Sequence, residues 1–138
     1  MLTNQRIIRI EWGDCDPEGI VYFPRYFEYF DSCTGTLFER AGLYKREMMK
    51  DYDIAGIPLV DMKARFMIPS RFGEDVMVES SVVEWGKSSF VVQHRLTKNG
   101  ALAVECAETR VWVGRAEGNP EKLVARAIPD EVKERFSA

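Results

Sequence analysis

The sequence has few of the residues that build common catalytic and metal-binding sites. Its 138 residues include one histidine and three cysteines, and the cysteines show no CxxC spacing. An odd number of widely separated cysteines predicts neither a disulfide framework nor a zinc site. A serine hydrolase is also unsupported, because the chain has no GxSxG motif. We therefore expect reduced, structural thiols and no metal or other cofactor.

Long apolar runs and an excess of basic charge are also missing. No stretch approaches the roughly 18 apolar residues that cross a bilayer, and the first residues do not resemble a secretion signal. The formal net charge of -3 leaves no basic surface for a nucleic acid. A hydrophobic content of 46% suits one core. We expect one cytoplasmic domain over residues 1–138, with no membrane or nucleic-acid partner.

The strongest pattern in the chain predicts a long amphipathic helix over residues 24–41. Pro24 suits the first helical position, because its missing N–H would have no partner there, and Gly42 suits the C-terminal cap. Apolar or small side chains recur at three- and four-residue steps, which places them on one face. They are Tyr26, Phe27, Phe30, Cys33, Thr34, Leu37, Phe38 and Ala41.

The rest of the chain reads mainly as strands joined by hairpins. Asn99-Gly100 is the strongest hairpin signal, since both residues tolerate the positive φ of a type I′ turn. The expected strands are 6–12, 59–68, 76–85, 89–97, 101–114 and 123–127, with a turn at 115–122 and short helices at 44–50 and 129–136. An antiparallel sheet that covers one long helix is an α+β fold. An open edge strand favours pairing with a second copy, which predicts a homo-oligomer.

An acidic loop precedes the long helix and contains Asp14, Asp16 and Glu18. It imitates a calcium loop, but Arg25 stands at the twelfth position, where a bidentate Glu is required. Cys15 lies between two aspartates, which disfavour a reactive thiolate. Neither a calcium site nor a cysteine nucleophile is therefore expected here.

A carboxylate beside a helix N-terminus can support acyl-transfer chemistry. Backbone N–H groups around residues 23–25 point outward at the positive end of the helix dipole, although Pro24 itself contributes none. They can hold a developing oxyanion while Asp16 attacks a carbonyl carbon or activates water. The acids could instead bind turn amides or balance the dipole, and the pattern leaves both interpretations open. His94 shares the strand face of apolar residues and is expected in the core or an interface.

Residues 13–24, GDCDPEGIVYFP, and the following helix with Asp31 resemble the motif of the 4-hydroxybenzoyl-CoA thioesterases, a family of hotdog-fold acyl-CoA thioesterases. The similarity continues through the segments 56–60 (GIPLV), 64–66 (ARF) and 84–90 (EWGKSSF), with His94 after the last of them. It extends over residues 6–128 and therefore includes most of the expected sheet.

This resemblance implies a hotdog fold, in which an antiparallel sheet wraps one central helix, and an assembly of dimers or tetramers with active sites at the dimer interface. It implies that Asp16 is the catalytic carboxylate, as nucleophile or general base. The backbone N–H of Phe23 would polarise the thioester oxygen. The implied substrate contacts are Asp31, Gly56, Pro58 and Lys87.

The chain departs from the family pattern in two places. Gly86 and Ser88 replace more basic residues, which leaves Lys87 as the evident phosphate partner. Phe23 stands where a related branch of short-chain acyl-CoA thioesterases carries His, which points away from that branch. Further basic candidates for the nucleotide end of CoA are Lys63, Arg65, Arg71, Arg115 and Arg126.

We expect an acyl-CoA thioesterase that converts an aromatic acyl-CoA, 4-hydroxybenzoyl-CoA or a close relative, to the free acid and CoA. An aliphatic acyl-CoA thioesterase and a non-catalytic acyl-CoA binding or sensing module are the alternatives. Asp16 argues against the binding module, because a carboxylate would repel the CoA phosphates. A hotdog dehydratase is disfavoured, because the acidic motif holds no His for proton transfer.

Overall fold

The computed structural model describes residues 1–137, so Ala138, the last residue of the expected domain, lies outside the described residues. Five antiparallel strands form one sheet in the order β1-β3-β4-β5-β2. Their bounds are β1 Thr3–Arg9, β2 Leu59–Phe66, β3 Asp75–Trp85, β4 Ser89–Lys98 and β5 Ala101–Val111. The predicted α+β class with an antiparallel sheet is confirmed.

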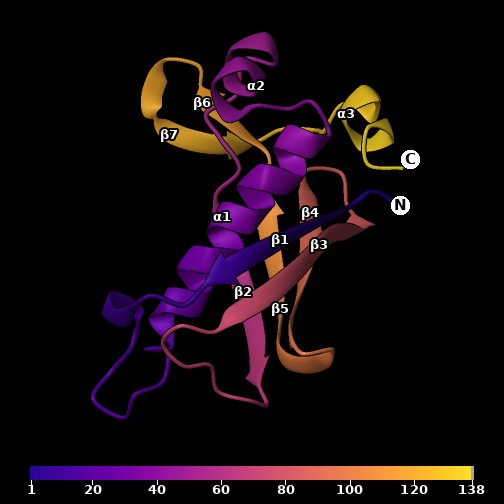
Figure 1. Ribbon diagram of the computed structural model, residues 1–138. Coiled ribbons are helices and arrows are strands. Elements are labelled where there is room, and N and C mark those ends of the chain that lie inside the picture. Colours follow the sequence, from indigo (N-terminus) through magenta and orange to yellow (C-terminus); the bar gives the residue numbers. More distant parts are fainter. Residues whose placement is uncertain (138) are drawn as a thin grey trace.

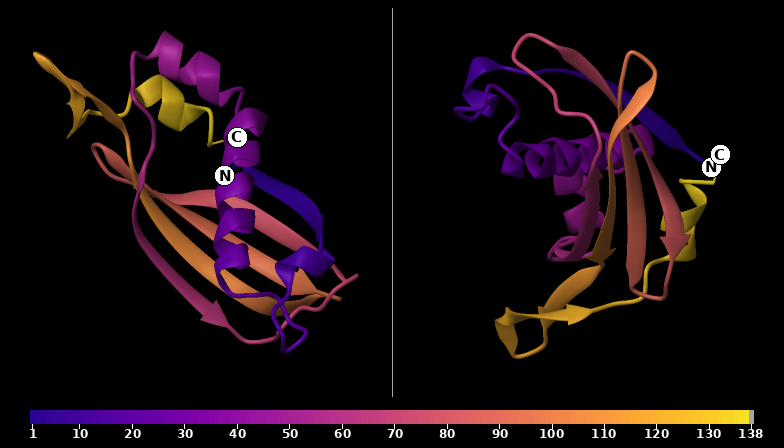
Figure 2. Two further views of the ribbon diagram at one scale, coloured as in Figure 1. Left: turned by 90° about the vertical axis from the view of Figure 1, so that its left-hand side faces the viewer. Right: turned by 90° about the horizontal axis from the view of Figure 1, so that it is seen from below.

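One long helix, α1 Pro24–Arg40, lies across the inner face of this sheet (Figure 1). Pro24 stands at its start as expected, and Gly42 follows its end with φ +80°. Views from the side and from below show the sheet curving around the helix (Figure 2). The predicted arrangement of a sheet wrapped on one central helix is therefore confirmed.

The apolar side of α1 packs into the core between helix and sheet. Its fully buried side chains include Phe30, Cys33 and Leu37. One cluster packs the first half of the helix against Val76, Val78, Leu96 and Val104, among others. A second cluster packs the other half against Val82, Phe90, Val92 and Trp112, among others. The helix is thus held along its whole length.

The turn at Asn99-Gly100 is confirmed, because the two residues have φ +49° and +82° and join β4 to β5. At the N-terminus the expected strand bounds are wrong. β1 begins at Thr3 and ends at Arg9, and Trp12 lies in the 3-10 helix η1 Trp12–Asp14. The 3-10 turn takes Trp12 off the strand face, and its side chain is 75% exposed.

The expected single strand 101–114 is also corrected, because it divides at the buried Trp112 into β5 and β6 Val113–Ala116. The expected turn 115–122 is wrong as well. Gly118, with φ +76°, allows a short turn, and β7 Asn119–Ala125 pairs with β6. The β6–β7 pair leaves the main sheet and projects beside α2 Lys45–Asp51 (Figure 1).

Two short helices complete the structure. α2 follows α1, as expected for residues 44–50, and α3 Asp130–Glu134 occupies the centre of the expected helix 129–136. Among residues 1–137 no helix is long and apolar enough to cross a membrane.

Two glycines with equally open surroundings test whether residue 35 lies in a helix and residue 100 in a left-handed turn. A Cβ added at Gly35 or at Gly100 would meet no atom within 4 Å, but only Gly100 has a positive φ. We expect Gly35→Ala to raise the free energy of unfolding by about 1 kcal/mol, because Ala favours a helix interior. Gly100→Ala should lower it by about 1 kcal/mol through left-handed strain. Urea denaturation of both variants measures the signs, and equal signs would contradict the assignment.

Candidate active site

The acidic loop forms a small hairpin directly before α1. Cys15 and Val21 are bridged, and the N–H of Asp16 donates to the carbonyl of Ile20 at 2.9 Å. At its tip Gly19 adopts φ +82°, and its N–H donates to the carbonyl of Asp16 at 2.9 Å. These bonds fix the backbone on both sides of the Asp16 side chain.

The Asp16 carboxylate has one oxygen engaged in this hairpin. Its Oδ1 accepts the backbone N–H of Glu18 at 2.8 Å, whereas no group in residues 1–137 donates to Oδ2. The side chain is partly exposed at a hollow of about 460 Å³. The lining residues are Trp12, Cys15, Asp16, Pro17, Gly19 and Phe72. One carboxylate oxygen is therefore available to a bound molecule.

The other aspartate of the loop is anchored more completely. Asp14 Oδ2 accepts the N–H of Glu11 at 2.9 Å, and Oδ1 lies 3.9 Å from Arg25 Nε. The carbonyl of Asp14 also accepts the N–H of Tyr22 at 2.8 Å. Both oxygens of Asp14 thus have a partner within the structure, whereas only one oxygen of Asp16 binds a turn amide.

Among residues 1–137, one backbone donor at the start of α1 has no acceptor. The N–H of Arg25 donates to Tyr22 at 2.8 Å and that of Tyr26 to Phe23 at 3.1 Å, while Pro24 has no N–H. Phe23 has helical angles, φ -52° and ψ -34°, and its N–H has no acceptor within residues 1–137. The expected group of donors at residues 23–25 is therefore reduced to the Phe23 N–H.

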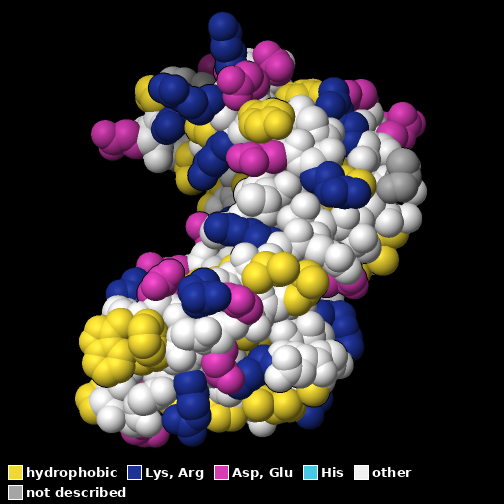
Figure 3. Space-filling model, viewed as in Figure 1, with side chains coloured by type: hydrophobic (Ala, Val, Ile, Leu, Met, Phe, Trp, Pro, Cys, Tyr) yellow, Lys and Arg dark blue, Asp and Glu magenta, His cyan; other side chains and the backbone are white. Residues whose placement is uncertain are grey.

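Asp31 lies eight residues further along the helix, about 12 Å from Phe23 along its axis. Its carboxylate lines a hollow of about 260 Å³ between α1, α2 and the loop before β2. The loop residues Gly56 and Pro58 line an adjoining hollow of about 250 Å³. Lys45, Ile57 and Arg110 line both hollows. The surface is visibly indented below α2, β6 and β7 (Figure 3). The structure thus brings Asp31 close to the 56–58 loop.

Lys87 lies apart from both groups. It is exposed in the connection between β3 and β4, and its carbonyl accepts the N–H of Ile128. Of the other basic candidates, Arg126 donates to the carbonyls of Asp53 and Arg115 at 2.8 Å and so has a structural role. Arg65 lies 3.6 Å from Glu105 in a surface ion pair.

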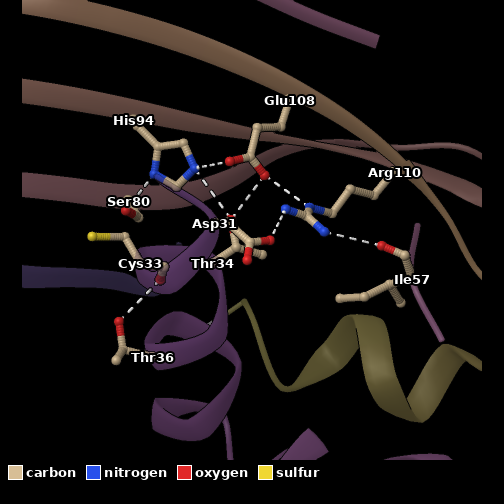
Figure 4. A network of polar contacts seen from close by, with 9 residues as sticks. All are labelled: Asp31, Cys33, Thr34, Thr36, Ile57, Ser80, His94, Glu108 and Arg110. Carbon is tan, nitrogen blue, oxygen red and sulfur yellow. Dashed lines mark hydrogen bonds and ion pairs between the residues drawn. The ribbon is translucent and has the colours of Figure 1, made fainter. Parts of the chain in front are cut away.

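A buried polar network crosses the interface between α1 and the sheet (Figure 4). His94 Nε2 lies 2.9 Å from Glu108 Oε1, and Thr34 Oγ1 donates to Glu108 Oε2 at 2.9 Å. Ser80 Oγ lies 2.7 Å from His94 Nδ1, and Phe30 stacks on the imidazole at 5.0 Å. His94 is fully buried, which confirms its expected place in the core.

Sequence reasoning missed Glu108 and Arg110, which complete this network. Arg110 Nε donates to Glu108 Oε2 at 2.8 Å. Burial acts to raise the pKa of Glu108, but the hydrogen bonds and charges of His94 and Arg110 outweigh it and hold that pKa below its ordinary value. A signal was present, because both residues share the strand parity of the buried Val104 and Cys106. Charged residues at core positions indicate a paired network.

The three thiols behave as expected for structural cysteines. Cys33 and Cys106 are buried, and burial raises their pKa values to about 11 and about 12. Cys15 is partly exposed beside the Asp16 hollow, with Sγ 3.7 Å from the carbonyl of Glu11. All three are free thiols.

Comparison with known proteins places this chain among thioester hydrolases. Residues 10–136 match the model of the thioesterase-like superfamily. The 4-hydroxybenzoyl-CoA thioesterase of Pseudomonas sp. (strain CBS-3) is 35% identical over 127 residues, which cover 88% of each chain.

Two solved structures extend this similarity. An aspartate-to-asparagine mutant of 4-hydroxybenzoyl-CoA thioesterase complexed with 4-hydroxybenzoyl-CoA superimposes with a TM-score of 0.88 at 30% identity, covering 98% of this chain and 99% of that one. A gentisyl-coenzyme A thioesterase superimposes with a TM-score of 0.82 at 27% identity, covering 98% and 100%. The chain belongs to the thioesterase-like superfamily, and its enzyme class is that of the hotdog-fold acyl-CoA thioesterases.

The buried carboxylate generates a prediction for acid stability. The pKa of Glu108 is lower in the folded protein than in the unfolded chain, so the unfolded chain takes up a proton first as the pH falls. The stability that ionised Glu108 contributes is therefore lost as the pH falls below 4.5, the ordinary pKa of a glutamate. We expect Glu108→Gln to lower the free energy of unfolding by about 3 kcal/mol at neutral pH. The free energy of unfolding of this variant should also fall less steeply between neutral and acid pH than that of the wild type.

Urea denaturation at a series of pH values measures both effects. Three other acids with lowered pKa values, Glu74, Asp75 and Glu131, are present in both proteins. The difference between the two curves of unfolding free energy against pH therefore reports the contribution of Glu108. Parallel curves would contradict the inferred ionisation of this residue.

Proposed function

We propose that the protein hydrolyses an aromatic acyl-CoA, 4-hydroxybenzoyl-CoA or a close relative, to the free acid and CoA. The observation that carries the mechanism is the unused N–H of Phe23 at the start of α1, on the segment that also presents the free oxygen of Asp16. The similarity to 4-hydroxybenzoyl-CoA and gentisyl-coenzyme A thioesterases supports the acyl class, because both acyl groups are hydroxylated benzoyl groups.

The reaction assigns separate roles to these two groups. The Phe23 N–H donates to the thioester oxygen and stabilises the negative charge that develops there. Asp16 Oδ2 attacks the carbonyl carbon or takes a proton from the attacking water. The hydrogen bond from Glu18 to Oδ1 orients the carboxylate before substrate binds. The products are a carboxylic acid and the CoA thiol.

The acyl group and CoA are proposed to bind through further residues. Asp31 accepts a hydrogen bond from a ring hydroxyl, and Gly56 and Pro58 form the wall of the adjoining hollow. Lys87 pairs with a CoA phosphate. Apolar lining by Phe38, Leu43, Met48 and Ile57 suits an aromatic ring beside Asp31.

We also propose that the single domain works in the cytoplasm as a homo-oligomer, a dimer or tetramer. The sheet ends at β2, an edge strand that itself exposes Leu59, Val60 and Phe66. Hydrophobic residues on an open edge favour pairing with a second copy. The separation of Asp31 from Phe23 along α1 supports a site shared between two copies, as the family resemblance implies.

Substitution of the catalytic carboxylate tests the mechanism. We expect Asp16→Asn to lower kcat about 10²- to 10⁴-fold, as for loss of a positioned base, while the fold and CoA binding persist. Asp14→Asn is the matched control, because an amide oxygen can still accept the Glu11 N–H. Steady-state thiol release should show a much smaller loss for the control. Retained turnover in Asp16→Asn would refute the assignment.

A substrate panel tests the acyl class. Thiol release is followed with 4-hydroxybenzoyl-, benzoyl-, phenylacetyl-, butyryl- and decanoyl-CoA. We expect kcat/KM for 4-hydroxybenzoyl-CoA to exceed that for either straight-chain substrate at least about tenfold, because a site that hydrogen-bonds a hydroxyl rejects analogues without one. A straight-chain preference would keep the mechanism and overturn the acyl class. CoA binding without hydrolysis of any substrate would indicate a sensor.

A further inference from the structure

Arg110 joins three separate parts of the structure through its three guanidinium nitrogens (Figure 4). Nε donates to Glu108 Oε2 at 2.8 Å, Nη2 to Asp31 Oδ1 at 2.8 Å and Nη1 to the carbonyl of Ile57 at 3.1 Å. The contacts therefore connect β5, the middle of α1 and the loop before β2. A planar guanidinium can hold three such partners at once, whereas an ammonium is a single point charge.

The inner end of this arrangement is rigid. The Glu108 side chain is fully buried and is held by His94 and Thr34 as well as by Arg110. The charge of Glu108 also offsets the cost of burying the guanidinium. Burial acts to lower the pKa of Arg110, but Glu108 and Asp31 outweigh it, and the pKa is raised. The fixed carboxylate thus holds the arginine in one orientation.

The outer end of the guanidinium contacts Asp31, which lies at the surface and is not needed to neutralise the buried Glu108–Arg110 pair. The Arg110 side chain is 9% exposed, but that of its partner Asp31 is 72% exposed. An exposed carboxylate ordinarily samples several rotamers, and fixing it for ligand binding costs conformational entropy. The bond from Arg110 removes that freedom in advance. The same arginine also holds the carbonyl of Ile57, which lines the 260 Å³ hollow as well.

We propose that Arg110 is a positioning residue for acyl recognition and that it sets the preference for acyl groups with a ring hydroxyl. It acts by holding the Asp31 carboxylate and the Ile57 carbonyl at fixed places around the hollow. Arg110 itself takes no part in cleavage of the thioester. This inference rests on the proposed function, because it concerns the acyl group of the same reaction.

The test is a double-mutant cycle of Arg110→Lys and Asp31→Asn. Lysine keeps the positive charge beside Glu108 and removes the three-way geometry. The ratio of kcat/KM for 4-hydroxybenzoyl-CoA to that for benzoyl-CoA is measured in all four proteins. We expect Arg110→Lys to lower this ratio about tenfold, as for loss of a charged hydrogen bond. The loss should appear mainly as a higher KM for the hydroxylated substrate.

The cycle distinguishes positioning from a structural effect. If Arg110 acts through Asp31, Arg110→Lys should lower the ratio no further in the Asp31→Asn background. An equal further loss there, or an unchanged ratio in the single variant, would overturn the proposal. An equal fall for both substrates would also overturn it, because a purely structural defect does not discriminate a hydroxyl.

Arg95→Lys is the matched control. Arg95 lies on the neighbouring strand β4 and pairs with Glu105 at 3.9 Å, but its side chain is 51% exposed and lines neither hollow beside Asp31. This variant should keep the wild-type ratio, and thermal unfolding of all proteins verifies that each is folded. If the wild type hydrolyses neither aromatic substrate, the proposed function fails and the inference fails with it. If Arg110→Lys keeps the wild-type ratio of kcat/KM for the two substrates, the inference about Arg110 fails but the proposed function stands.

Discussion

Burial of the apolar side of α1 against the curved sheet is the interaction on which the remaining structure depends. Phe30, Cys33 and Leu37 are fully enclosed by the sheet, and each large buried side chain contributes about 1.5–3 kcal/mol. Because the helix is held along its length, the hairpin with Asp16 has a fixed place at one end and α2 at the other (Figure 1). The positions of the candidate groups follow from this packing.

The same interface contains charged groups that an apolar core would exclude. Burying Glu108 is costly, and the cost is offset only because each carboxylate oxygen has a partner in His94, Thr34 or Arg110. Apolar contacts tolerate small changes of packing, whereas these hydrogen bonds require one rotation of α1. The network therefore fixes which residues of the helix face the hollow, and Asp31 is among them.

The chain presents two groups of candidate residues rather than one. The Asp16 hairpin and the Phe23 N–H lie at the start of α1, while Asp31, Ile57 and Arg110 surround a hollow near its middle. Within residues 1–137 the first group has a backbone N–H without an acceptor and a carboxylate with one free oxygen. The second group has an apolar wall and a carboxylate held by Arg110. On the proposed function, catalysis and acyl recognition are thus carried by separate elements of the fold.

The sequence by itself determined the features that depend on neighbouring residues. Helical periodicity identified α1, Asn99-Gly100 identified a turn, and strand parity put His94 in the core, because each follows from local backbone geometry and side-chain alternation. Motif resemblance indicated the acidic loop as the candidate site, because the residues of that motif are contiguous in the chain.

Tertiary structure alone decided the features that depend on distant contacts. Arg110 meets Asp31 across 79 positions of the chain, and no periodicity encodes that meeting. At the strand break the N–H of Trp112 donates to the carbonyl of Ser88, and the carbonyl of Trp112 accepts the N–H of Arg126. Within residues 1–137 the Phe23 N–H has no acceptor because the turn before α1 supplies no carbonyl to it. Local patterns specify elements and faces, but side-chain pairing across the fold specifies which polar groups remain free to bind a ligand.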